Sequence, residues 1–137
     1  MVSQASRGQM LIQAVSDRSV LIVEDNDASR KLARIVLGEA GFEVHTAVDA
    51  EDALDQLARI SPRVILTDLQ LPGMQGLELV RRLASDPRRA KMVVIAFTAN
   101  CDKSDVECAK AAGCDDFIAK PIDLDCLIDT VRRAFWA

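Results

Sequence analysis

The chain has 137 residues, of which 50% are hydrophobic and 28% charged, with a formal net charge of −4 at pH 7. This length suits one domain with a core of ordinary size, and the composition is typical of a globular protein rather than a disordered one. The negative charge argues against direct binding to nucleic acid, because domains that neutralise phosphates normally carry a basic excess.

The four cysteines and the single histidine do not form a zinc motif. No C-x-x-C pair is present, so we expect reduced thiols that pack like small apolar residues in a cytoplasmic protein. They are Cys101, Cys108, Cys114 and Cys126. The apolar segment MLIQAV near the N-terminus is too short for a signal sequence with its cleavage site or for a membrane span, so no membrane partner is expected.

Residues 1–18 are rich in Ser, Gln and Ala and show no sustained period, so they are predicted to form a flexible N-terminal arm. Within them QMLIQAVSDR is compatible with a short helix. Residues 19–137 are predicted to form one domain, in which short apolar runs alternate with amphipathic stretches, as in repeated βα units. The predicted strands are VLIV (20–23), EVHTA (43–47), VILT (64–67), MVVIAFT (92–98) and FIA (117–119).

Helical spacing of apolar residues recurs between these runs. Leu32, Ile35, Val36 and Leu37 mark a first helix, which Gly41 closes. Four further helices are marked by Ala50, Ala53, Leu54 and Leu57, by Leu77, Val80 and Leu83, by Val106 and Ala109 before Gly113, and by Leu124, Leu127, Ile128, Val131 and Phe135. Because parallel crossovers are right-handed, this order predicts an α/β fold, a doubly wound parallel sheet covered by helices on both faces.

Polar side chains follow four of the predicted strands. Asp25 comes after the first strand, Asp68 after the third, Thr98 ends the fourth, and Lys120 follows the fifth. In open parallel sheets ligands bind beyond the carboxyl ends of the strands. We therefore expect these four side chains to converge on one crevice.

The carboxylates of Glu24, Asp25 and Asp68 would repel one another there unless a cation lay among them. Oxygen ligands with room for water describe a Mg²⁺ site. Lys120 adds a positive charge and Thr98 a hydroxyl beside Asp68, an arrangement that suits Asp68 to carry a phosphoryl group.

The segments EDN, DLQLPGMQG and AAGCDDFIAKP together resemble the receiver domain of response regulators in two-component signalling, over about residues 19–135. The resemblance implies a flavodoxin-like (βα)5 fold with strand order 2-1-3-4-5. It also implies that Asp68 accepts a phosphoryl group from the phosphohistidine of a histidine kinase or a histidine phosphotransfer protein.

The same resemblance implies roles for the residues around Asp68. Mg²⁺ would be bound by Asp25, Asp68 and the backbone carbonyl of Gln70, with Glu24 acting through water. Lys120 would pair with Asp68 or with the phosphate, and its peptide bond to Pro121 would be cis.

After phosphorylation, Thr98 would move to the phosphate and Phe117 would fill the space that it leaves, so these two residues form the expected switch. The remodelled surface would be that of the fourth helix, fifth strand and fifth helix. Phe117 stands where tyrosine is also frequent, which excludes a contact through a hydroxyl. Gln75 stands where aspartate is commonest, outside the expected metal ligands.

The chain ends two residues after the last predicted helix, so we expect no DNA-binding or catalytic output domain. We expect a self-phosphorylating signalling domain rather than an enzyme, with intrinsic autodephosphorylation as an option. It would switch downstream partner proteins or relay the phosphoryl group, with a homodimer left open. A receiver excised from a hybrid histidine kinase is an alternative.

Four other functions compete. An EF-hand would need Gly at Arg30 and Glu at Val36, and a carrier of flavin mononucleotide would need a loop rich in glycine and hydroxyl groups after the first strand. A phosphatase with an aspartate nucleophile is suggested by Asp25 and Asp27, but it would not require Asp68, Thr98 and Lys120. A passive receiver-like binding module is the last alternative.

Several polar residues are interpreted as structural. Asn26 or Asp27 is expected to cap the first helix, and His45 to lie at a strand end or on the surface. The basic residues Arg81, Arg82, Arg88, Arg89 and Lys91 are interpreted as a solvated helix face and loop.

Overall fold

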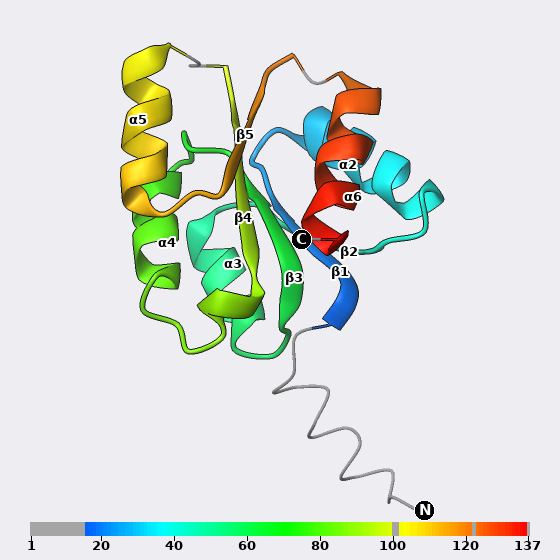
Figure 1. The fold of residues 1–137 in the computed structure, drawn as a ribbon, viewed down its shortest axis with the longest axis horizontal. Helices are drawn as coiled ribbons and strands as arrows, with labels where there is room; N and C mark the ends of the chain where they lie inside the picture. Colours follow the sequence, from blue (N-terminus) through cyan, green and yellow to red (C-terminus); the bar gives the residue numbers. More distant parts are fainter. Residues whose placement is uncertain (1–15, 100–101, 122, 137) are drawn as a thin grey trace, which may run out of the picture.

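The computed structural model describes residues 16–99, 102–121 and 123–136. One parallel sheet holds the five described strands in the order β2-β1-β3-β4-β5, as expected (Figure 1). The strands are β1 (Ser16–Val23), β2 (Glu43–Ala47), β3 (Pro62–Thr67), β4 (Val93–Thr98) and β5 (Asp116–Ala119). The helices are α2 (Asp27–Glu39), α3 (Ala50–Leu57), α4 (Gly76–Leu83), α5 (Lys103–Ala112) and α6 (Leu124–Trp136), with a short 3₁₀ helix η1 (Arg89–Lys91).

Strand β1 lies at the centre of the core, because its apolar residues are buried on both faces of the sheet. Residues 20–23 are all 0% exposed. Side chains alternate along a strand, so Val20 and Ile22 enter one hydrophobic cluster while Leu21 and Val23 enter the other. This burial explains the uninterrupted apolar run in the sequence.

The helices form two layers on opposite sides of the sheet (Figure 1). Helices α3, α4 and α5 bury their apolar residues with Leu21 and Val23, whereas α2 and α6 pack on the other face. Phe42 and Phe135 stack there with ring centroids 5.1 Å apart, joining the start of β2 to the end of α6. The carboxyl ends of the strands share one edge of the sheet, at the top of Figure 1.

The N-terminal boundary differs from the predicted one. Strand β1 begins at Ser16, so the last three residues of the expected arm belong to the sheet, and Ser16 pairs with Pro62 of β3. The register shifts between Ser16 and Val20, which leaves only the apolar run in continuous pairing with β3. Residues 1–15, with most of the segment considered as a short helix, lie outside the described residues.

The first predicted helix is present as α2, but only part of its predicted apolar face is buried. Leu32 and Ile35 are 46% and 52% exposed, while Ala33 and Leu37 are buried. Asn26 is the N-cap, and its side chain accepts a hydrogen bond from the Ser29 amide at 2.9 Å. The apolar residues of α2 are therefore divided between the core and the solvent.

The cysteines of the described residues are free, but only one of the three is packed in the core. Burial, together with the charge of Asp115, raises the pKa of Cys114 to about 11. Cys108 and Cys126 are exposed, which corrects the prediction of uniformly packed thiols, and Cys101 lies outside the described residues. Among the described helices, none has the length and apolar character needed to cross a membrane.

Two of the basic residues interpreted as solvated, Arg88 and Arg89, instead hold separate segments of the chain together through hydrogen bonds. The Arg88 guanidinium donates to the carbonyls of Leu57 and Ile60, at 2.9 Å each, and pairs with Asp86 at 2.9 Å. Arg89 joins η1 to the chain before β5 by donating to the carbonyl of Gly113 and to the carboxylate of Asp115. These side chains are 24% and 19% exposed.

We predict that Arg88→Ala lowers the free energy of unfolding by about 2–3 kcal/mol, because two carbonyls lose their guanidinium donor and Asp86 loses its ion pair, keeping the backbone amide of residue 88. Urea unfolding monitored by circular dichroism measures the change. Arg82→Ala is the matched control. The Arg82 side chain is 54% exposed, and Glu78, at 3.5 Å, is its one polar partner among the described residues, so its loss should cost less than about 0.5 kcal/mol. An equal loss of unfolding free energy in the two variants would contradict a structural role of Arg88.

The ion pair should also make stability depend on pH. A hydrogen bond from Arg88 lowers the pKa of Asp86 below its ordinary value of 3.8. A carboxylate whose pKa is lower in the folded state adds stability above the unfolded pKa, and that stability is lost as pH falls through the folded value. Asp86→Asn should therefore be less stable than the wild type at neutral pH, and the difference should narrow below pH 3.8. Urea unfolding of both proteins across this range tests the expectation, and a constant difference would refute it.

Candidate functional site

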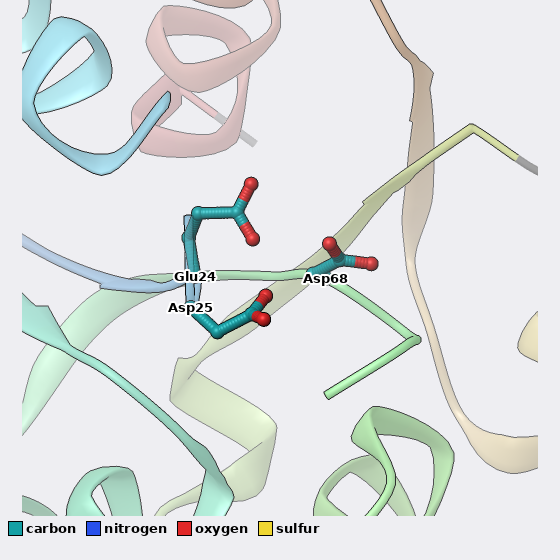
Figure 2. Close-up of side chains that lie close together, drawn as sticks. All are labelled: Glu24, Asp25 and Asp68. Carbon is teal, nitrogen blue, oxygen red and sulfur yellow. The ribbon is translucent and has the colours of Figure 1, made fainter. Parts of the chain in front are cut away.

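The acidic and basic residues predicted to converge do lie together at the carboxyl edge of the sheet. Glu24 and Asp25 follow β1, Asp68 follows β3, and Lys120 follows β5. Oxygen atoms from Glu24, Asp25 and Asp68 lie within 4.8 Å of one another. Figure 2 shows the three side chains grouped around one small space, with Glu24 and Asp25 on one segment and Asp68 beside them.

The three carboxylates differ in their exposure to solvent. Glu24 is 0% exposed and Asp68 is 6% exposed, whereas Asp25 lies on the surface. Backbone hydrogen bonds fix the two strand ends, because the Glu24 amide donates to Ala47 and the Asp68 amide donates to Val23, each at 3.0 Å. The cluster is thus buried on one side and open at Asp25.

Lys120 joins the two buried carboxylates. Its Nζ donates to Oε1 of Glu24 at 2.6 Å and to Oδ2 of Asp68 at 2.7 Å. The same ammonium lies 4.9 Å from the centroid of the Phe97 ring, a cation–π distance. The contact between Lys120 and Asp68 is present as expected, while the contact between Lys120 and Glu24 was not foreseen.

Burial and charge shift the pKa values of this group. Burial raises the pKa of Glu24, and Asp68 adds to the rise, although the hydrogen bond from Lys120 opposes it. Burial alone would lower the pKa of Lys120, but hydrogen bonds to Asp68 and Glu24 outweigh burial, and the net shift is upward. Lys120 is therefore held in its charged form.

The donor set fits a hard divalent cation. The second oxygen of Glu24, Oε2, is buried and accepts no hydrogen bond from any described residue. A buried carboxylate oxygen without a donor is costly, and a cation or a water bound to a cation would satisfy it. Carboxylates at this spacing, with one of them exposed, match the few protein ligands that Mg²⁺ takes.

Asp68 is held from three sides, at its carboxylate and at its backbone carbonyl. The Gln70 amide donates to Asp68 Oδ1 at 2.9 Å, and the Thr67 hydroxyl donates to the Asp68 carbonyl at 2.9 Å. Gly76 closes the third side, because a Cβ there would lie 2.0 Å from the Asp68 carbonyl oxygen. Only glycine fits this approach, which explains the last glycine of the DLQLPGMQG segment.

The two switch candidates lie on neighbouring strands. Thr98 is 1% exposed at the end of β4, and Phe117 is half-buried in β5 beside the cluster that packs against α3, α4 and α5. Ala96 pairs with Phe117 and Thr98 with Ala119, so the period of two places Thr98 and Phe117 on one face of the sheet. The peptide bond between Lys120 and Pro121 is cis.

Gln75, which departs from the commonest residue of the resembled family, is the N-cap of α4. Its backbone is extended, but its side chain makes no capping hydrogen bond. An aspartate would supply that bond. The departure therefore affects the start of α4.

Sequence reasoning missed three contributors to the site, and each had only a weak signal. Arg30 of α2 donates to the carbonyl of Glu24 at 2.9 Å, and nothing in the sequence sets it apart from the solvated arginines common in helices. Glu51 of α3 accepts a hydrogen bond from the Met74 amide at 3.0 Å and so supports the segment between β3 and α4. The role of Gly76 could have been recognised from the sequence. Glycine is a poor helix former, so a glycine at the first position of a helix indicates another constraint, such as a close approach of the backbone.

Residues 20–132 match the family model described as the response regulator receiver domain. The curated proteins named polar-differentiation response regulator DivK, from Brucella anthropi and Brucella ovis, are 37% identical over 115 residues. The alignments cover 84% of this chain and 94% of each of those proteins.

Solved structures show the same fold. A putative response regulator from Chloroflexus aurantiacus superposes with a TM-score of 0.83 at 31% identity, covering 88% of this chain and 98% of that one. The chemotaxis response regulator CheY4 of Vibrio cholerae gives a TM-score of 0.81 at 26% identity, covering 88% and 99%. The receiver domain of a histidine kinase from Syntrophus aciditrophicus gives 0.79 at 30% identity, covering 86% and 89%.

We predict that Gly76→Ala destabilises the protein by about 3 kcal/mol, because the new methyl group would force the Asp68 backbone to move. Gly38→Ala is the matched control. Gly38 lies inside α2, and a Cβ added there would meet nothing within 4 Å, so this change should stabilise the helix by about 0.5–1 kcal/mol. Urea unfolding of both variants measures the two effects, and a neutral Gly76→Ala would contradict the close approach.

Proposed function

The chain belongs to the response regulator receiver family, and on that premise we propose that Asp68 accepts a phosphoryl group from the phosphohistidine of a partner protein, in a reaction that requires Mg²⁺. The observation that carries this proposal is the position of Lys120, whose Nζ lies 2.7 Å from Asp68 Oδ2 and 2.6 Å from Glu24 Oε1. An aspartate beside a held ammonium and two further carboxylates has the surroundings that phosphoryl transfer requires.

In this proposal, Glu24, Asp25, Asp68 and the backbone carbonyl of Gln70 would hold Mg²⁺, with Glu24 acting through water. When bound, the ion neutralises negative charge on the carboxylates and on the phosphoryl oxygens. The exposed Asp25 provides the open side from which a donor can approach Asp68.

The residues of the chain orient the nucleophile and balance its charge. The Gln70 amide fixes Asp68 Oδ1, and Lys120 holds Oδ2. A carboxylate oxygen of Asp68 forms the new bond to phosphorus as the bond from phosphorus to the donor imidazole breaks. The charged Lys120 then remains beside the phosphoryl oxygens, where it offsets part of the added negative charge.

We further infer that Thr98 and Phe117 transmit the change. A phosphoryl group adds roughly −1.5 to −2 charges and three acceptor oxygens. Thr98 ends the strand beside Phe117 on the same face of the sheet, so a displacement of Thr98 opens space on the side toward which the ring packs. The surface of α5, β5 and α6 is the proposed output face toward partner proteins.

The rival assignment as an aspartate-nucleophile phosphatase has no support. Asp27, the second aspartate of its D-x-D pattern, is not part of the carboxylate cluster. Its side chain is 78% exposed and pairs with Arg30. The cytoplasmic location expected from the sequence stays a prediction.

Phosphorylation can be tested with the intact chain, acetyl phosphate and Mg²⁺, followed by intact-mass measurement. We expect a labile adduct of one phosphoryl group on the wild type, which Asp68→Asn abolishes because the acceptor oxygen is lost. Asp55→Asn, a change in α3 outside the carboxylate cluster, is the control and should leave the adduct unchanged. A wild type that forms no adduct would refute the proposal, and steady phosphate release that depends on Asp25 would favour the phosphatase.

A further inference from the structure

Arg30 makes an unusual set of contacts at the start of α2. Its guanidinium is mostly buried, with the side chain 15% exposed. Nη1 donates to the carbonyl oxygen of Glu24 at 2.9 Å and reaches that of Asp25 at 3.5 Å. Nη2 pairs with Asp27 Oδ1. One side chain thus contacts two residues of the connection between β1 and α2 and the first residue of α2.

Helix geometry explains the direction of this side chain. Side chains of a helix tilt toward its N-terminus, so a residue in the first turn reaches back over the residues that precede the helix. The planar fork of arginine can serve two acceptors at once, which a lysine ammonium on its flexible stem does with less precision. The contacts are therefore specific to arginine at this position.

Stabilisation of the helix explains only one contact of Arg30, its i,i+3 ion pair with Asp27 inside α2. The N-terminal end of a helix carries partial positive charge, which disfavours a cation in the first turn. Asn26 already caps α2 by accepting a hydrogen bond from Ser29. The contacts of Arg30 with the Glu24 and Asp25 carbonyls act on the connection rather than on the helix.

The backbone of this connection matters because the Asp25 side chain is not held in place by contacts of its own with other described residues. Within the part of the chain that the structure describes, no hydrogen bond or ion pair holds the Asp25 carboxylate, so its direction depends on its backbone. The Glu24 amide is fixed by Ala47 at 3.0 Å. Arg30 holds the carbonyls on either side of the Asp25 Cα.

We propose that Arg30 is a positioning residue for the divalent cation: it fixes the backbone around Asp25, so that the Asp25 carboxylate faces Asp68 before the cation binds. This inference rests on the proposed function, since it assumes that Asp25 is a ligand of Mg²⁺. Arg30, although it is not itself a ligand, would then contribute to the affinity for the cation.

Charge and geometry predict opposite effects when Arg30 is removed. A guanidinium near the carboxylates repels an incoming cation, so by Coulomb's law alone its removal should strengthen Mg²⁺ binding. If Arg30 acts by orientation, its removal should weaken binding, since partners that orient ligands typically contribute 10- to 100-fold in metal affinity. The sign of the change distinguishes the two.

The experiment is isothermal titration calorimetry of the full chain with MgCl₂, at a temperature well below the melting transition of each variant. We expect Arg30→Met to bind Mg²⁺ about 10-fold more weakly than the wild type. Arg34→Met is the matched control. Arg34 is exposed in the same helix, and its replacement removes the same charge without touching the connection, so Mg²⁺ affinity should stay within about twofold.

A second readout separates positioning from general damage. For phosphorylation by acetyl phosphate, the Mg²⁺ concentration that gives half the maximal rate should rise about 10-fold in Arg30→Met, in step with the calorimetry. The rate at saturating Mg²⁺ should stay near that of the wild type, because Asp68 and Lys120 are untouched.

Affinity that is unchanged or increased in Arg30→Met would overturn the inference. If this variant does not fold, Arg30→Lys tests the inference, because it keeps the positive charge and loses the planar guanidinium. Mg²⁺ affinity weakened several-fold in Arg30→Lys supports positioning, and wild-type affinity overturns it. A wild type that neither binds Mg²⁺ nor becomes phosphorylated would overturn the proposed function and this inference together. That outcome is distinguishable because it does not depend on residue 30.

Discussion

The ammonium of Lys120, shared by two carboxylates at the end of a buried sheet, is the contact on which the rest of the site depends. Glu24 is fully buried, so without Lys120 it would be an uncompensated charge, a costly state in a protein interior. Lys120 lies 96 residues from Glu24 and 52 from Asp68 along the chain. The site therefore exists only once the outer strand β5 has joined the sheet.

Much of this arrangement could be predicted, because it follows from backbone periodicity and strand direction. The apolar runs at 20–23 and 64–67 are buried on both faces, and such runs are hard to mistake for anything other than central strands. Parallel strands end at one edge, so Asp68 and Lys120 were expected there from their places in the sequence alone. The strand order needed the family resemblance as well.

The remainder depends on where long side chains go, which local spacing does not encode. Arg88 looked like part of a solvated basic group, yet its partners Leu57 and Ile60 lie 31 and 28 residues away. Leu32, Ile35 and Leu37 have helical spacing, but of these only Leu37 is buried, and Ala33 packs beside it against the sheet. A small residue such as Ala33 lets a helix lie close to a sheet, and the spacing of large apolar residues does not reveal this.

The sheet divides the interior into two compartments that share no side chain, since alternate residues of β1 enter separate clusters. Phe117 belongs to the compartment of α3, α4 and α5, whereas α2 belongs to the other. Rearrangement around this ring therefore begins in the layer of α3, α4 and α5, and α2 lies on the opposite face of the sheet. A partner attached through α2 would thus lie on the other side of the sheet from Phe117 and α5, so that attachment through α2 and readout at α5 would use different residues.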